Sequence, residues 1–139
     1  MAVDVARYFY KGGLNCAEST LRCLIEDGVI APPPEVVRMM TGFGGGMQRG
    51  TTCGAAVAAI GWATGRTEPG QSREPSAAAV REFLRRFEET FGSLTCRELQ
   101  AVYVKEHALK SEGMYRSCTA FVEKAVELAQ DILGRASLA

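Results

Sequence analysis

Apolar residues recur at helical spacing along several segments of the chain, and glycine or proline separates these segments. In the clearest segment the apolar positions share one helical face: Val80, Phe83, Leu84, Phe87 and Phe91. The positions between them are mostly Arg and Glu, and Gly92 follows where a C-terminal cap belongs. This pattern predicts an amphipathic helix that buries one face.

Similar patterns predict most of the remaining chain as helix. The other expected helices cover about residues 3–11, 16–27, 34–41, 52–63, 96–112 and 114–133. Asn15 with Glu18, and Thr95 with Glu98, have the spacing of a capping box. No segment has the pattern of a strand or a repeat. The sequence therefore predicts one all-α domain over residues 1–139, a compact bundle of about six or seven helices with no sheet.

Residues 42–50 contain five glycines and predict a loop with unusual backbone freedom. The spacing Gly45-x₄-Gly50-Thr51 resembles a phosphate-binding loop, but the essential Lys is missing and no strand precedes it, which disfavours nucleotide binding. Two interpretations remain. The segment is either a compact turn that leads into the next helix, or bare backbone whose N–H groups pack against a disulfide or an inorganic cluster.

Composition and charge narrow the class of protein. The 16 basic and 16 acidic residues balance, so no nucleic-acid partner is expected. No apolar run approaches the roughly 20 residues of a membrane span. The first residues lack the basic-then-apolar order of a signal peptide, so a cytoplasmic protein is expected. Five reduced cysteines in that compartment indicate metal binding or redox chemistry.

Three cysteines directly follow a residue that favours the N-cap position. They are Cys16 after Asn15, Cys53 after Thr52 and Cys96 after Thr95. Each thiol is therefore expected at the first position of a helix, where unpaired N–H groups and the helix dipole lower the pKa of a thiol and favour the thiolate.

The other two cysteines have less distinctive positions. Cys118 follows Ser117 and either repeats the cap pattern or lies inside a helix that begins near Met114. Cys23 lies in the middle of a predicted helix and is expected in the core. The chain has no C-x₂-C pair, and nothing in the sequence supports a Cys–His pair with the single His107. A shared site must therefore be assembled from distant helix ends.

The motifs around these cysteines resemble those of a known family. Asn15-Cys16-Ala17, Phe43-Gly44-Gly45-Gly46-Met47, Arg49-Gly50 and Thr52-Cys53-Gly54-Ala55, followed by Cys96 and Cys118, are similar to the redox-active proteins named for the pattern C_GCAxxG_C_C. The Cys-Gly-Ala-x-x-Gly run of that family ends here in Ala58. A similar domain occurs beside haem-binding sequence in split-Soret cytochromes, whereas this chain has no haem attachment motif.

The resemblance implies that Cys16, Cys53, Cys96 and Cys118 are the redox or metal-ligating residues. The residues expected to contact a cofactor are Gly44, Gly45, Gly46, Arg49, Gly50 and Gly54. Two forms of a redox site stay open: an iron–sulfur cluster on four thiolates, and one or two reversible disulfides. The protein would then be an oxidoreductase or electron carrier with a separate redox partner, as a monomer or homo-oligomer. The alternatives are a zinc-stapled or a plain helical interaction module.

Overall fold

The computed structural model describes residues 8–9, 12–26, 33–63, 68–104 and 113–133. The α-helices are α2 (Cys16–Glu26), α3 (Pro34–Arg38), α4 (Gly54–Ala63), α5 (Glu74–Phe91), α6 (Cys96–Glu98) and α8 (Gly113–Leu128). Shorter or irregular helical turns are η1 (Thr41–Phe43), η2 (Gly46–Gly50), η3 (Leu99–Val104) and η4 (Ala129–Leu133). Over these ranges the only β-type pairing is one isolated bridge, so the all-α prediction is confirmed.

Several sequence expectations fall on other parts of the chain. Most of the predicted helix 3–11, the helix ends at Gly28 and Gly134, and His107 lie outside the described residues. Within the described ranges, no helix combines the length and the apolar character needed to cross a bilayer.

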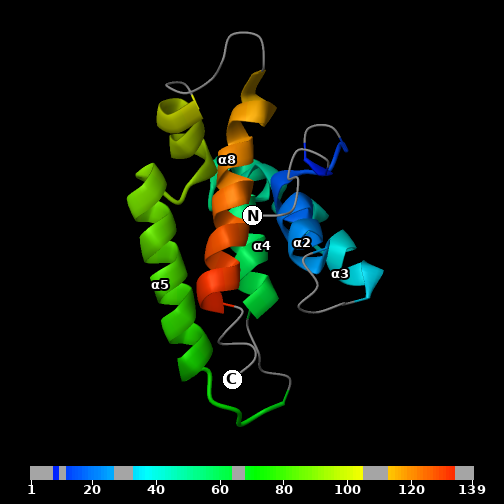
Figure 1. Cartoon of the computed structure of the whole chain (residues 1–139), viewed down its shortest axis with the longest axis vertical. Helices are drawn as coiled ribbons and strands as arrows, with labels where there is room; N and C mark the ends of the chain where they lie inside the picture. Colours follow the sequence, from blue (N-terminus) through cyan, green and yellow to red (C-terminus); the bar gives the residue numbers. More distant parts are fainter. Residues whose placement is uncertain (1–7, 10–11, 27–32, 64–67, 105–112, 134–139) are drawn as a thin grey trace.

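Helix α4 lies at the centre of the bundle, and α2, α5 and α8 pack around it (Figure 1). Its side chains are small, and Ala55, Ala56, Ala58 and Ala59 are fully buried. Small side chains let neighbouring helices approach closely, and close packing gives the dispersion contacts that stabilise a core. The small-residue composition of this segment thus explains its central place.

Helix α5 buries the apolar stripe that the sequence predicts. Phe83 and Phe87 are fully buried, and Phe91 packs edge-on against Phe121 of α8, with 4.9 Å between ring centroids. Such pairs contribute about 0.5–1.5 kcal/mol beyond the area they bury. Gly92 ends the helix with φ 86° and donates its N–H to Glu88 O, so the predicted cap is confirmed.

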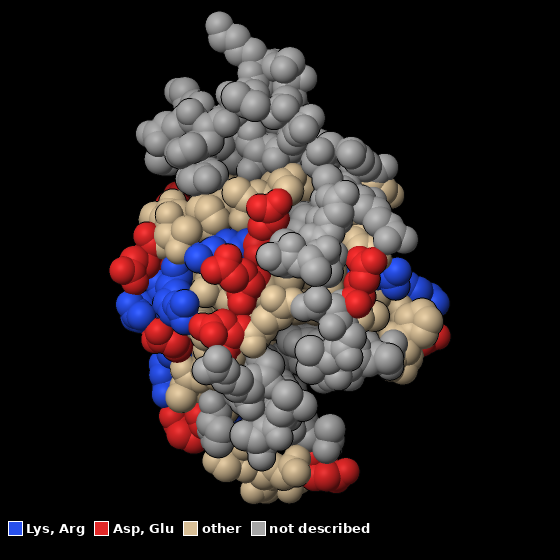
Figure 2. All heavy atoms as spheres, viewed as in Figure 1, with Lys and Arg blue, Asp and Glu red and all other residues tan. Residues whose placement is uncertain are grey.

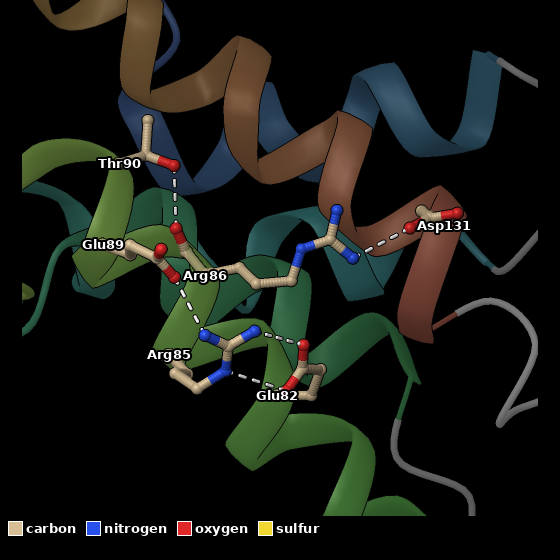
Figure 3. Close-up of polar contacts among 6 residues, drawn as sticks. All are labelled: Glu82, Arg85, Arg86, Glu89, Thr90 and Asp131. Carbon is tan, nitrogen blue, oxygen red and sulfur yellow. Dashed lines mark hydrogen bonds and ion pairs between the residues drawn. The ribbon is translucent and has the colours of Figure 1, made fainter.

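The outer face of α5 carries charged side chains of both signs (Figure 2). Arg85 is paired with Glu82 and Glu89 on the same helix, and Arg86 Nη1 reaches Asp131 Oδ2 of η4 at 3.0 Å (Figure 3). Exposed ion pairs of this kind contribute little to stability. The burial of the phenylalanine stripe therefore holds α5 in place.

Candidate functional site: a cavity lined by four cysteines

One cavity of about 200 Å³ collects the four cysteines that the sequence singles out. The cysteines come from four separate parts of the chain: Cys16 in α2, Cys53 just before α4, Cys96 in α6 and Cys118 in α8. The rest of the wall is apolar, amide or glycine: Phe9, Asn15, Gly45, Gln48, Gly54, Leu99, Gln100 and Phe121. Cys23 of α2 is fully buried in the core of the protein, as predicted, and does not line this cavity.

The start of α2 fixes Cys16. Asn15 Oδ1 accepts the Glu18 N–H, and Glu18 Oε1 accepts the Asn15 N–H, at 2.9 and 3.0 Å. The predicted capping box is therefore confirmed. The same Asn15 side chain donates to Thr41 O at 2.9 Å, which ties the start of α2 to the segment before the glycine loop.

An isolated antiparallel bridge between Thr52 and Thr95 brings Cys53 and Cys96 together. The Cys53 N–H donates to Leu94 O at 2.8 Å, and the Cys96 N–H donates to Thr51 O at 2.6 Å. Two cysteines that are far apart in sequence thus enter the cavity from adjacent backbones.

Cys53 is the N-cap of α4 rather than its first helical residue, so the predicted helix start is one position early. The reason is that Thr52 takes part in the bridge with Thr95. The sulfur of Cys53 instead accepts hydrogen bonds from the N–H groups of Ala55 and Ala56. These are the positions that an N-cap side chain satisfies in most helices.

The predicted capping box between Thr95 and Glu98 is wrong. Thr95 has the extended backbone of an N-cap, but its side chain makes no cap hydrogen bond. The Ser93 hydroxyl donates to Glu98 Oε2 at 2.8 Å and accepts the Thr95 N–H at 3.1 Å. The buried Ser93, rather than Thr95, therefore provides the side-chain hydrogen bonds at this helix start. Cys96 still begins α6.

Cys118 lies inside α8, which begins at Gly113. Of the two positions that the sequence allowed, the one inside a helix is correct. Its thiol is half-buried against the core and lines the cavity without a helix N-terminus behind it.

The lowered thiol pKa expected from a helix N-terminus is wrong for Cys53 and Cys96. Burial, with a smaller effect from the nearby Cys16, raises the pKa of Cys53 to about 12. The hydrogen bonds from the N–H groups of Ala55 and Ala56 act in the opposite direction and lower it. Burial, with smaller effects from Cys16 and Cys96, also raises the pKa of Cys118 to about 12. The pKa of Cys96 is raised by burial and by Cys16, and lowered by a hydrogen bond from Gln100. Desolvation of the charged form outweighs the helix N-termini.

The glycine loop forms a left-handed turn at the cavity wall. Gly45, Gly46, Met47 and Gln48 have φ values of 62°, 61°, 60° and 59°. This conformation costs roughly 1–2 kcal/mol for each residue with a side chain. Thr51 closes the turn, because its N–H and its hydroxyl both donate to Gly46 O, at 3.0 and 2.7 Å.

Of the residues expected to contact a cofactor, Gly45 and Gly54 line the cavity. The others lie behind its wall or on the surface. A Cβ on Gly44 would meet the Asn15 side chain, and one on Gly46 would lie 2.6 Å from Thr51 backbone atoms. Gly50 packs against Arg97, and the Arg49 side chain is exposed. These glycines allow close backbone packing around the cysteines.

Sequence reasoning missed Gln100. Its Nε2 donates to Cys96 Sγ at 3.1 Å, and it lines the cavity. The spacing of four residues from Cys96 on a predicted helix was the available signal.

The four cysteines are the donor type that thiolate-bound metal groups use. Cysteine thiolates are the usual ligands of iron–sulfur clusters, and Cys₄ sets are also ligands for zinc. Among the described residues, no three Cys, His, Asp or Glu side chains are placed to hold a single metal ion. The four cysteines line the cavity of about 200 Å³ together with apolar, amide and glycine residues.

An all-α domain with four cysteines around one cavity defines the class of this protein as a cysteine-centred helical domain. The chain belongs to the family described as "Putative redox-active protein (C_GCAxxG_C_C)", whose match spans residues 14–132. No curated protein and no solved structure matches the chain.

Proposed function

We propose that this protein is an electron-transfer protein in which Cys16, Cys53, Cys96 and Cys118 hold an iron–sulfur cluster. The observation that carries the proposal is the convergence of these cysteines, from four separate parts of the chain, on one cavity. Such a cluster accepts and donates single electrons. Its reduction potential depends on the hydrogen bonds to its sulfur atoms and on its burial.

The residues around the cavity supply both hydrogen bonds to sulfur and burial. Gln100 donates to the Cys96 sulfur, and the N–H groups of Ala55 and Ala56 donate to the Cys53 sulfur. Phe9, Leu99 and Phe121 form an apolar part of the wall. Donors to sulfur stabilise its negative charge, and apolar side chains keep water away.

The raised thiol pKa values disfavour disulfide exchange in the metal-free protein. The attacking species in exchange is the thiolate, and thiols with a pKa of about 12, such as Cys53 and Cys118, are almost wholly protonated near neutral pH. A metal-containing group reverses this balance, because its positive charge stabilises the thiolates.

Reversible disulfides are the second candidate. The shared cavity supports this candidate, because Cys16 lines it with the other three cysteines and contributes electrostatically to the raised pKa of each of them. None of these four cysteines is in a disulfide in the described part of the chain.

Anaerobic purification separates the candidates. We expect a coloured protein that contains iron and acid-labile sulfide and loses its visible absorption on acidification. A colourless protein whose thiol titre rises after reduction would favour disulfides instead. Stoichiometric zinc would favour a structural site, and unreactive thiols with no metal would favour a plain interaction module.

A further inference from the structure

Two exposed arginines lie beside the cysteine cavity and have no acidic partner among the described residues. Arg49 follows Gln48, and Arg97 follows Cys96, and both preceding residues line the cavity. Arg97 Nη2 donates to Arg49 O at 3.1 Å, so the two cationic residues belong to one local surface.

The backbone of the left-handed turn holds this arrangement. Gly50 has φ 70°, and the Arg97 side chain lies across it, with Cβ and Nε within 3.2 and 3.3 Å of the place where a Cβ would stand. A side chain on Gly50 would push Arg97 away. The glycine thus lets the arginine lie flat beside the cavity.

Most other described cations on the helices have a partner. Arg81 pairs with Glu74, Arg86 with Asp131 and Lys124 with Glu127. Glu98, the acidic neighbour of Arg97 in the chain, accepts a hydrogen bond from Ser93. Among the described residues, Arg49 and Arg97 therefore present positive charge beside the cavity without a salt bridge.

Met47 adds an apolar contact to the same surface. Its side chain is 41% exposed, and its backbone is held at φ 60° between two residues that line the cavity, Gly45 and Gln48. Strained residues cluster at functional sites, and Met and Arg are enriched in protein interfaces. We call Met47, Arg49 and Arg97 the arginine rim.

We infer that the arginine rim is the docking site of an acidic one-electron carrier protein. The inference rests on the proposed function. Positive charge at the edge of a redox site steers an anionic partner and speeds association. In the transfer step the docked carrier would lose one electron to the iron–sulfur cluster that the four cysteines would hold, and the cluster would return one electron to a carrier that is oxidised.

Binding of two carriers of opposite charge tests the inference without requiring electron transfer. An acidic flavodoxin and a basic cytochrome c are titrated into the full-length protein by calorimetry at about 20 mM and about 300 mM salt. We expect flavodoxin to bind at low salt and to weaken at high salt, and cytochrome c not to bind.

The matched variants are Arg49→Glu with Arg97→Glu, Met47→Ser, and Arg73→Glu as the control, all checked by circular dichroism. Arg73 is exposed and precedes α5, away from the cavity lining. The double rim variant should lose at least about tenfold in flavodoxin affinity, Met47→Ser should lose less, and Arg73→Glu should lose little.

Equal binding of both carriers, or equal losses in the rim and control variants, would overturn the inference. The double variant Arg49→Glu with Arg97→Glu could also lose affinity for free phosphate as well as for flavodoxin, while Met47→Ser has no effect. That result would identify a small-anion site and would also overturn the inference. If the protein contains neither cluster nor reducible thiols, the proposed function fails while this binding result stays readable.

Discussion

Thr52 and Thr95 form an antiparallel bridge that joins the loop before α4 to the loop before α6. The residues that follow them, Cys53 and Cys96, are thereby held at neighbouring positions on the cavity wall. The N–H groups of both cysteines donate hydrogen bonds across this bridge, Cys53 to Leu94 O and Cys96 to Thr51 O. The site thus depends on a backbone pairing that is neither helix nor sheet.

Gly54 is expected to be intolerant of any side chain. A Cβ there would lie 2.6 Å from Phe43 O and 2.7 Å from Cys16 Sγ. Gly54→Ala should therefore lower the free energy of unfolding by about 1–3 kcal/mol, since neither neighbour is free to move without disturbing the cavity. Urea unfolding measures this loss.

Gly61 in the same helix is the control, because it is exposed and a Cβ there meets nothing within 4 Å. Gly61→Ala should be neutral or stabilise the protein by about 0.4–1 kcal/mol. An equal loss in both variants would show that helix α4 rejects alanine for reasons other than contact with Cys16.

The raised pKa values of Cys53 and Cys118 predict a loss of stability in alkali for the reduced, cofactor-free protein. In the unfolded chain, Cys53 and Cys118 ionise near their ordinary value of 9.0, whereas in the folded protein their pKa is about 12. Below about pH 8 they contribute no pH dependence. As the pH rises further, the free energy of unfolding should fall by up to about 1.4 kcal/mol per pH unit for each thiol.

Denaturant unfolding between about pH 7 and about pH 11 measures this slope, and comparison with Cys118→Ala isolates one thiol. The variant should show a shallower slope than the wild type. Parallel curves would mean that Cys118 ionises as easily in the folded protein as in the unfolded chain.

Gln100 should control the reactivity of Cys96. Loss of its hydrogen bond to sulfur in Gln100→Leu removes an interaction worth about 0.5–1.5 kcal/mol, so the pKa of Cys96 should rise further. Alkylation of Cys96 by iodoacetamide, followed by mass spectrometry, should slow by about two- to tenfold near pH 8.

Gln48→Leu is the matched control, because Gln48 lines the same cavity but donates to Gly44 O rather than to sulfur. Its effect on Cys96 alkylation should be small. A greater slowing in Gln48→Leu than in Gln100→Leu would show that access to the cavity, rather than hydrogen bonding, sets the rate.

Periodicity was sufficient to predict α5, because Phe83 and Phe87 recur on the face that this helix buries. Local rules failed where tertiary contacts intervened. Thr52 pairs with Thr95, which moves the start of α4, and the thiol pKa of Cys53 depends on a burial that no local motif reveals. Positive φ at Met47 was equally hidden, because glycine is the residue that predicts it.

The central claim is that four cysteines, and not five, form one site. Iron and acid-labile sulfide per chain, measured in anaerobically isolated wild type and five single Cys→Ala variants, test it most directly. We predict that Cys23→Ala keeps the wild-type content, because Cys23 is a core residue away from the cavity, and that each of the other four variants loses most of it. Wild-type content in Cys16→Ala, Cys53→Ala, Cys96→Ala or Cys118→Ala, or its loss in a folded Cys23→Ala, would contradict the claim.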